Sequence, residues 1–240
     1  MIMCTVVFIP GNKGYNLASL RDENPERPVA FSPEIFNNNT TSFLFPKDAL
    51  AGGTWIGTNS IGNSIVLLNG GFKSHQRATC HRKSRGLIVV DLLACEKPVA
   101  AWNILDLKDI DPFTLIVWSN KQLHHLIWDG IKKYSNNLNT SKHYIWSSST
   151  LYNAIAKDKR QTLYEDWVKT IPTINEQTLL SFFNSFEDKV NGFIINRNEQ
   201  LKTLSYTFLE VIHNKKITMS YNDFLNNTNN KKSMPLKKSQ

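Results

Sequence analysis

Residues 4–20 read CTVVFIPGNKGYNLASL, and this stretch predicts how the chain begins to fold. Cys4–Pro10 is rich in β-branched and aromatic residues, which favours a strand. The residues Pro10–Gly14 are typical of a turn, and Tyr15–Leu20 is a second apolar run. The stretch therefore predicts a β-hairpin whose second strand returns the chain close to where the first one began.

The same pattern of paired apolar runs recurs downstream. The predicted strands are Thr54–Thr58 with Ser64–Asn69, Phe113–Ser119 with Leu123–Asp129, the short His143–Trp146, and Thr203–Ile212 with Lys216–Tyr221. The predicted helices are Ser84–Cys95, Pro98–Leu105, Leu151–Ile171 and Asn175–Phe186. Hairpins that alternate with helices in this order indicate antiparallel sheet with helices on its outer faces, and not an alternating β-α-β fold.

Other segments are predicted to lack regular structure. The charged, proline-bearing stretch Arg21–Pro28 is not expected to lie inside a strand. Residues 32–50, rich in Asn, Thr and Pro, are expected to be a loop. We expect a single domain over residues 1–225, followed by a basic, flexible tail over residues 226–240.

The net charge of +8 is concentrated in two places. Lys73–Arg85 holds five basic residues and no acidic one, and the tail holds four lysines. This distribution does not resemble a recognition helix, so we expect no nucleic-acid partner. The internal cluster, with Arg82 and Arg85, could bind an anionic ligand; the alternative is a solvated loop and helix start.

Composition excludes several classes of protein. No apolar run reaches the ~18 residues that a membrane span needs. The N-terminal residues carry no basic stretch of the kind that opens a secretory signal. Cys4, Cys80 and Cys95 are odd in number and lack metal-ligand spacing, which favours a reducing, cytoplasmic location. We expect no metal and no cofactor.

Cys4 is the residue that most suggests chemistry. It follows Met3, and if the mature chain began at Cys4, one residue would carry both a thiol and an α-amine. An α-amine titrates near ~8 and can act as general base for its own side chain. Arg21 would favour the thiolate, and Asp22 would orient the ammonium. The alternatives are a buried cysteine on a first strand and a solvated charged turn.

A set of ordered motifs resembles the transport-and-Golgi-organisation, or NRDE, family. The motifs are Met3-Cys4, Leu20-Arg21-Asp22-Glu23 with Arg27-Pro28, Gly52-Gly53-Thr54-Trp55-Ile56-Gly57, and Leu67-Leu68-Asn69. Arg85-Gly86, Tyr144–Leu151 and Thr203–Thr207 are similar to later segments of the family. The similarity is sharp over residues 3–86 and keeps its order to about residue 220.

The resemblance implies an N-terminal-nucleophile hydrolase-like fold, a four-layer α/β/β/α sandwich. Wider relatives cleave non-peptide amide bonds with an N-terminal Cys, a nearby Arg and Asp, an Asn for the oxyanion and a late Arg. By this likeness the catalytic candidates are Cys4, Arg21, Asp22, Asn69 and Ser148. The candidates for ligand binding are Glu23, Arg27, Trp55, Arg82 and Arg85; for Trp55 the alternative is core packing.

The sequence departs from the pattern at three positions. Leu20 replaces an Asn, Ser148 stands where the later Asn belongs, and Leu204 stands where the late Arg belongs. In addition, Met1-Ile2 precede Met3, so the α-amine of Cys4 is free only after a later start or a cut. A second hypothesis is therefore a non-enzymatic protein that binds or moves haem or an acyl-CoA-like hydrophobic anion.

Overall fold

The computed structural model describes residues 5–38, 40–75 and 81–237. Strands β1 (Thr5–Gly11) and β2 (Gly14–Glu23) form the predicted hairpin, with Thr5 opposite Leu20 and Gly11 opposite Gly14. The hairpin lies within the first of two sheets, which has the order β10-β1-β2-β12-β13-β14. The other strands of this sheet are β10 (Tyr144–Ser147), β12 (Leu201–Ile212), β13 (Lys216–Asp223) and β14 (Thr228–Pro235), and the short β11 (Asn196–Arg197) pairs with β12.

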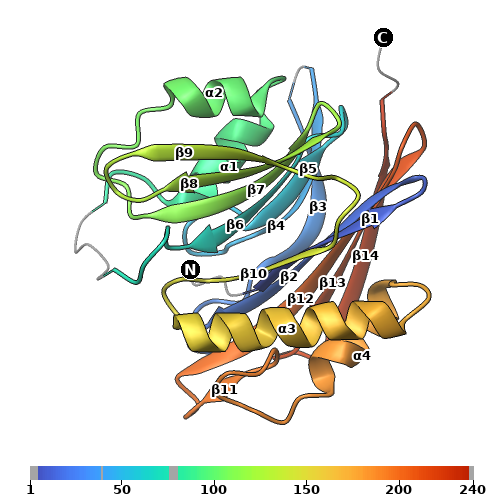
Figure 1. The fold of residues 1–240 in the computed structure, drawn as a ribbon. Helices are drawn as coiled ribbons and strands as arrows, with labels where there is room; N and C mark the ends of the chain where they lie inside the picture. The colour runs from blue at the N-terminus through green and yellow to red at the C-terminus, as the bar shows by residue number, and fades with distance from the viewer. Residues whose placement is uncertain (1–4, 39, 76–80, 238–240) are drawn as a thin grey trace.

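The second sheet is an antiparallel meander of seven strands in chain order. Its strands are β3 (Phe31–Asn37), β4 (Ser42–Lys47), β5 (Ile56–Asn59), β6 (Ser64–Asn69), β7 (Phe113–Ser119), β8 (Gln122–Trp128) and β9 (Lys133–Leu138). Helices α1 (Arg85–Leu93) and α2 (Pro98–Ile104) pack on this sheet, whereas α3 (Ala154–Thr170) and α4 (Glu176–Asn184) cover the first one (Figure 1).

Strand alternation divides the core into two layers. On β1, Val6 and Phe8 lie in the large cluster that includes both sheets, α1 and α2, whereas Val7 and Ile9 lie in a second cluster with α3 and α4. Successive side chains of a strand point to opposite faces, so one strand supplies both clusters. The predicted four-layer α/β/β/α sandwich of mainly antiparallel sheets is confirmed.

The strands missed by sequence lie mostly at sheet edges. Residues 32–50 were predicted to be a loop, which is wrong, because β3 and β4 occupy most of this range. β3 is an edge strand whose pairing shifts between Phe31 and Glu34, and this irregularity accommodates Pro33. Arg21–Glu23 was also predicted to lie outside a strand, but it is the buried end of β2.

Residues 228–235 form β14, where the composition predicted a solvated, flexible tail. The strand pairs with β13 along its whole length, so main-chain hydrogen bonds hold a segment whose side chains are mostly exposed. Met234 is its one buried side chain. Lysines on an edge strand also discourage its pairing with the edge of another sheet. A polar, lysine-bearing sequence is therefore compatible with an edge strand.

Among the described residues, no helix is long and apolar enough to cross a membrane.

Candidate active site

Four strand ends meet at one end of the sandwich. Thr5, the first residue of β1, pairs with Leu20 near the end of β2 and with Ser147 at the end of β10. The Ser148 hydroxyl donates a hydrogen bond of 2.9 Å to the main-chain carbonyl of Asn69, the last residue of β6. These contacts bring together segments that carry most of the predicted catalytic residues. Cys4 itself lies outside the described residues.

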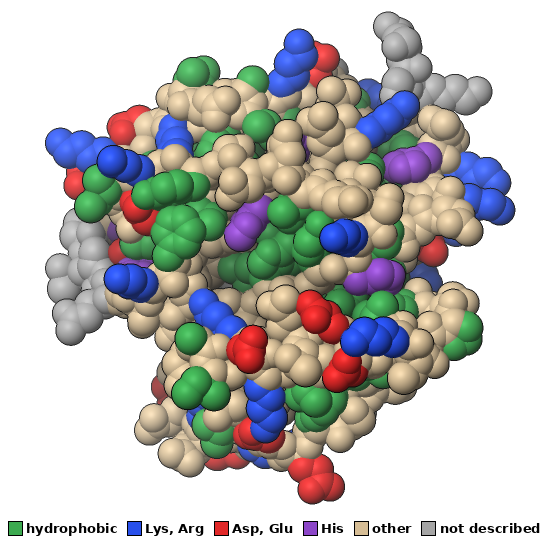
Figure 2. Space-filling model, viewed as in Figure 1, with side chains coloured by type: hydrophobic (Ala, Val, Ile, Leu, Met, Phe, Trp, Pro, Cys, Tyr) green, Lys and Arg blue, Asp and Glu red, His purple; other side chains and the backbone are tan. Residues whose placement is uncertain are grey.

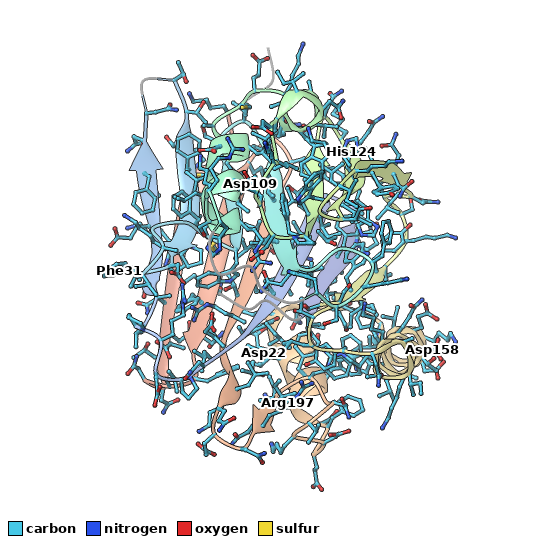
Figure 3. The ribbon with its side chains drawn as sticks, turned by 90° about the vertical axis from the view of Figure 1, so that its left-hand side faces the viewer. Asp22, Phe31, Asp109, His124, Asp158 and Arg197 are labelled. Carbon is cyan, nitrogen blue, oxygen red and sulfur yellow. The ribbon has the colours of Figure 1, made fainter. Side chains whose placement is uncertain are left out.

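Asp22 lies at this end of β2, on the face that is directed toward α3. Its side chain is fully buried. Thr203 Oγ1 donates a hydrogen bond of 2.6 Å to Asp22 Oδ1, and the Tyr152 hydroxyl donates one of 3.3 Å to Oδ2. Figure 3 shows Asp22 inside the molecule, in the lower half of the view, where Arg197 is also labelled. The two hydroxyl donors fix the orientation of the carboxylate at this position.

Arg21 points to the opposite face of β2, between the two sheets. Its Nη2 lies 3.1 Å from Asp48 Oδ2, and its Cζ lies 4.9 Å from the centroid of the Trp55 ring. Arg21 Nε has no hydrogen-bond partner within the described part of the chain. Trp55 is fully buried beneath this guanidinium, so it packs in the core and does not form an open surface for a ligand.

Asp48 is a buried residue of this site that the sequence did not single out. It accepts two hydrogen bonds from Arg27, of 3.0 and 2.8 Å, and one of 2.7 Å from the amide of Ala51. Burial acts to raise the pKa of Asp48, but the bonds from Arg27 and Ala51 and the charges of Arg27 and Arg21 hold that pKa below its usual value. The missed signal is an acidic residue just before the Gly52-Gly53 pair, in a segment predicted to be a loop.

Glu23 and Arg27, both predicted to bind a ligand, are engaged with the protein. Arg27 Nε lies 3.6 Å from Glu23 Oε2, and the same guanidinium pairs with Asp48 as described above. Glu23 Oε1 accepts a hydrogen bond of 3.1 Å from the amide of Asn24. The pair therefore fixes the chain that leaves β2 against the loop before β5.

Arg160 of α3 is a second buried charge that sequence analysis missed. Its guanidinium donates to the Thr5 hydroxyl, to Ser147 Oγ at 2.9 Å, and to the carbonyls of Asn191 and Gly192. The group lies over the Tyr152 ring, 4.2 Å from its centroid. No pattern in the sequence pointed to this residue, because its partners are as much as 155 positions away.

A cleft of about 260 Å³ opens beside this cluster. Asn69 and Ser148 contribute to its wall, as does Ser147, the partner of Thr5. The space-filling view shows hydrophobic side chains in the hollow above α3 (Figure 2). Because the Ser148 hydroxyl gives its one proton to the Asn69 carbonyl, it would have to leave this bond to stabilise an oxyanion.

Two of the three basic residues predicted to bind a ligand lie at a separate hollow of about 150 Å³. Arg27 and Arg85 both contribute to its wall, together with His81, Lys83 and Asp111. Lys83 is paired with Asp91, and Arg85 Nη1 donates a hydrogen bond of 3.1 Å to the carbonyl of Pro112. Arg82 is not part of this wall. Its exposed side chain lies 3.2 Å from Asp106.

Within the part of the chain that the structure describes, no group of three or more His, Cys, Asp or Glu side chains is arranged to hold a metal ion.

Comparison with solved structures identifies the fold. An N-acylethanolamine-hydrolyzing acid amidase ortholog from Caenorhabditis elegans superposes with a TM-score of 0.58 at 15% identity, over 86% of this chain and 92% of that chain. A mutant of the conjugated bile acid hydrolase from Clostridium perfringens gives a TM-score of 0.63 at 9% identity, over 97% and 92%. A second variant of that hydrolase gives 0.61 at 10% identity, over 98% and 97%. At these identities the likeness establishes the N-terminal-nucleophile hydrolase fold alone.

Comparison by sequence gives one further result. The family model described as Transport and Golgi organisation 2 matches residues 3–216. No curated protein matches the sequence.

Proposed function

The chain belongs to the Transport and Golgi organisation 2 family, and from this premise we propose that it hydrolyses a small non-peptide amide with Cys4 as its nucleophile. The observation that carries the proposal is the meeting of strand ends around Thr5. Cys4 directly precedes Thr5 in the sequence. Thr5 is opposite Leu20, which directly precedes Arg21 and Asp22.

In the proposed reaction, the α-amine of Cys4 takes the thiol proton and the thiolate attacks the amide carbonyl carbon. The oxyanion that forms is stabilised by the side-chain amide of Asn69, which lies at the end of β6. The intermediate collapses to a thioester as the α-ammonium gives its proton to the departing amine. Water then attacks the thioester, which releases the acid and restores the thiol.

Arg21 and Asp22 have separate roles in this proposal. The Arg21 guanidinium favours the thiolate by its charge, and its unused Nε–H is available to a nearby anion. Asp22, held by Thr203 and Tyr152, orients the α-ammonium in this proposal. We assign Arg160 as a positioning residue, because it anchors Thr5 and thus the start of β1.

The test is amide turnover by Cys4→Ala and Cys4→Ser variants of a chain that begins at residue 4. Alanine removes the nucleophile, so turnover should fall to the uncatalysed rate while the unfolding midpoint stays unchanged. The matched control is Cys95→Ala, which removes a partly exposed free thiol and should keep the full rate. Turnover that persists in Cys4→Ala would exclude this nucleophile.

A second candidate function is non-enzymatic binding of haem or an acyl-CoA-like anion at the basic hollow. It is supported by Arg27, Lys83 and Arg85, which contribute to one wall. Haem binding would give a saturable shift of the Soret band that an Arg85→Met variant weakens. A linear, non-saturating titration at micromolar protein would remove this candidate.

A further inference from the structure

The cleft beside Thr5 has an uneven distribution of charge. Among the described residues that form its wall, Lys157 is the one that carries a full charge, and no Asp or Glu contributes to the wall. The neighbouring Asp158 is exposed and lies on the outer side of α3 (Figure 3). A cation in an otherwise uncharged cleft attracts an anion more strongly than the same cation in water, because little solvent screens the interaction.

The ammonium of Lys157 is held in place by the fold. Its Nζ donates a hydrogen bond of 3.0 Å to Ser149 Oγ, and the Ser149 hydroxyl in turn donates to the carbonyl of Gly71. Burial lowers the pKa of Lys157, which indicates that solvation of the ammonium is incomplete. Only one of its three N–H groups is used by Ser149, so the others are available to a bound molecule.

The remainder of the cleft wall is largely apolar. Phe72, Ile127, Ile145 and Trp146 contribute to it. His125 also lies there, with its ring centroid 6.0 Å from that of Trp146. Burial lowers the pKa of His125, which favours its uncharged form. Such a wall favours a ligand with an apolar group.

Resting on the proposed function, we propose that the substrate is a small amide that carries an apolar group and a carboxylate, and that Lys157 binds the carboxylate. A single compact ammonium suits a monoanion; a phosphate is usually bound by several cations or backbone amides. The volume of about 260 Å³ is near the lower end of small-molecule sites, which are ~300–1,000 Å³, and this favours a small substrate.

The experiment measures binding without turnover. N-(phenylacetyl)glycine and its methyl ester are titrated by calorimetry into full-length protein that carries Cys4→Ala. We expect the acid to bind at least tenfold more tightly than the ester, and Lys157→Met to remove this difference. Lys157→Arg, which keeps the charge, should retain most of it. Lys159→Met, which removes an exposed lysine from the same helix, is the matched control and should change nothing.

Two results would overturn the inference: equal affinities for acid and ester in the parent protein, or a preference for the acid that survives Lys157→Met. Hydrolysis by protein with Cys4 intact separates this inference from the proposed function. Binding that depends on Lys157 without any hydrolysis would contradict the proposed function and leave the carboxylate site standing. Equal hydrolysis of acid and ester would contradict the carboxylate site and leave the proposed function standing.

Discussion

Arg21 and Asp22 are neighbours in sequence but belong to different parts of the site. Arg21 lies between the sheets with Asp48 and Trp55, whereas Asp22 lies on the helix side with Thr203 and Tyr152. This separation follows from strand alternation once β2 is known to extend to Glu23. The two residues therefore lie on opposite faces of the sheet, at the end of β2 that is next to the start of β1.

The buried carboxylate of Asp48 gives a prediction about stability and pH. Asp48→Asn should lower the free energy of unfolding at pH 7 by about 3 kcal/mol, because it removes the counter-charge of the buried Arg21 and leaves Arg27 paired with Glu23 alone. The pKa of Asp48 is depressed in the folded protein, so its contribution is present above the unfolded pKa of ~3.9 and is lost as pH falls further. Urea unfolding of both proteins from pH 7 to pH 3 should show their difference shrinking below about pH 4.

The matched control for Asp48 is Asp106→Asn, which removes an exposed partner of Arg82. Exposed ion pairs contribute ~0–1 kcal/mol, so this variant should unfold almost like the parent protein. A difference between Asp48→Asn and the parent that stayed constant down to pH 3 would contradict the assigned ionisation of Asp48.

At the scale of elements, two glycines allow the backbone of helix α1 to contact the loop before β5 closely. A Cβ on Gly53 would lie 2.3 Å from the carbonyl carbon of Gly86 and 2.5 Å from the amide nitrogen of Leu87. The amide of Thr54 donates a hydrogen bond of 3.1 Å to the Gly86 carbonyl across the same contact. The Gly-Gly-Thr-Trp and Arg-Gly motifs are therefore two halves of one backbone contact.

This contact predicts that Gly53→Ala is destabilising. The methyl group meets backbone atoms that cannot move without displacing α1, and overpacking of this kind costs ~1–3 kcal/mol. Chemical denaturation should show a loss in this range. Gly11→Ala is the control, because its nearest neighbour would be at 3.4 Å, an ordinary contact. A Gly53→Ala protein as stable as Gly11→Ala would disprove the close packing.

The sequence predicted the central elements well and the edge strands poorly. Apolar runs such as Phe113–Ser119 are buried along their whole length, so their composition is unambiguous. β9 carries mostly exposed polar side chains, so its composition does not predict a strand. It is a strand because its main chain pairs with β8. Edge strands of this kind form because they pair with a neighbouring strand, and the periodicity of their own sequence does not reveal that partner.

At the scale of the whole molecule, β14 joins the two sheets at their far edge. The strand pairs with β13 and contacts β3 and β4, and the amide of Lys237 donates a hydrogen bond of 2.7 Å to the carbonyl of Ser60. Met234 lies in the large core cluster, which contains residues of both sheets. The C-terminal strand thus closes the sandwich.

Met234→Ala should therefore lower the free energy of unfolding by about 2 kcal/mol or more, as for other buried methionines. Lys232→Ala, one exposed side chain on the same strand, should change it by less than about 0.5 kcal/mol. Both are measured by urea unfolding. No effect of Met234→Ala would mean that this segment is the solvated tail that its composition predicted.

The candidate site was only partly predictable, because some of its contacts join residues that are far apart in the sequence. Arg21 and Asp22 stand out as a charged pair at the end of a hairpin, whereas Asn69 was predicted from the family resemblance. Asp48 and Arg160 make their contacts across 27 and 155 residues. Only the closed sandwich brings such partners together, so no local pattern predicts them.

The most direct test of the central claim compares two forms of the protein in one amide-hydrolysis assay. One form is cut to begin at Cys4, and the other retains Met1-Ile2-Met3. If Cys4 is an N-terminal nucleophile, only the cut form will hydrolyse N-(phenylacetyl)glycine, because only its α-amine is free to take the thiol proton. Equal rates for the two forms, or no hydrolysis by the cut form of this amide or its methyl ester, would contradict the claim.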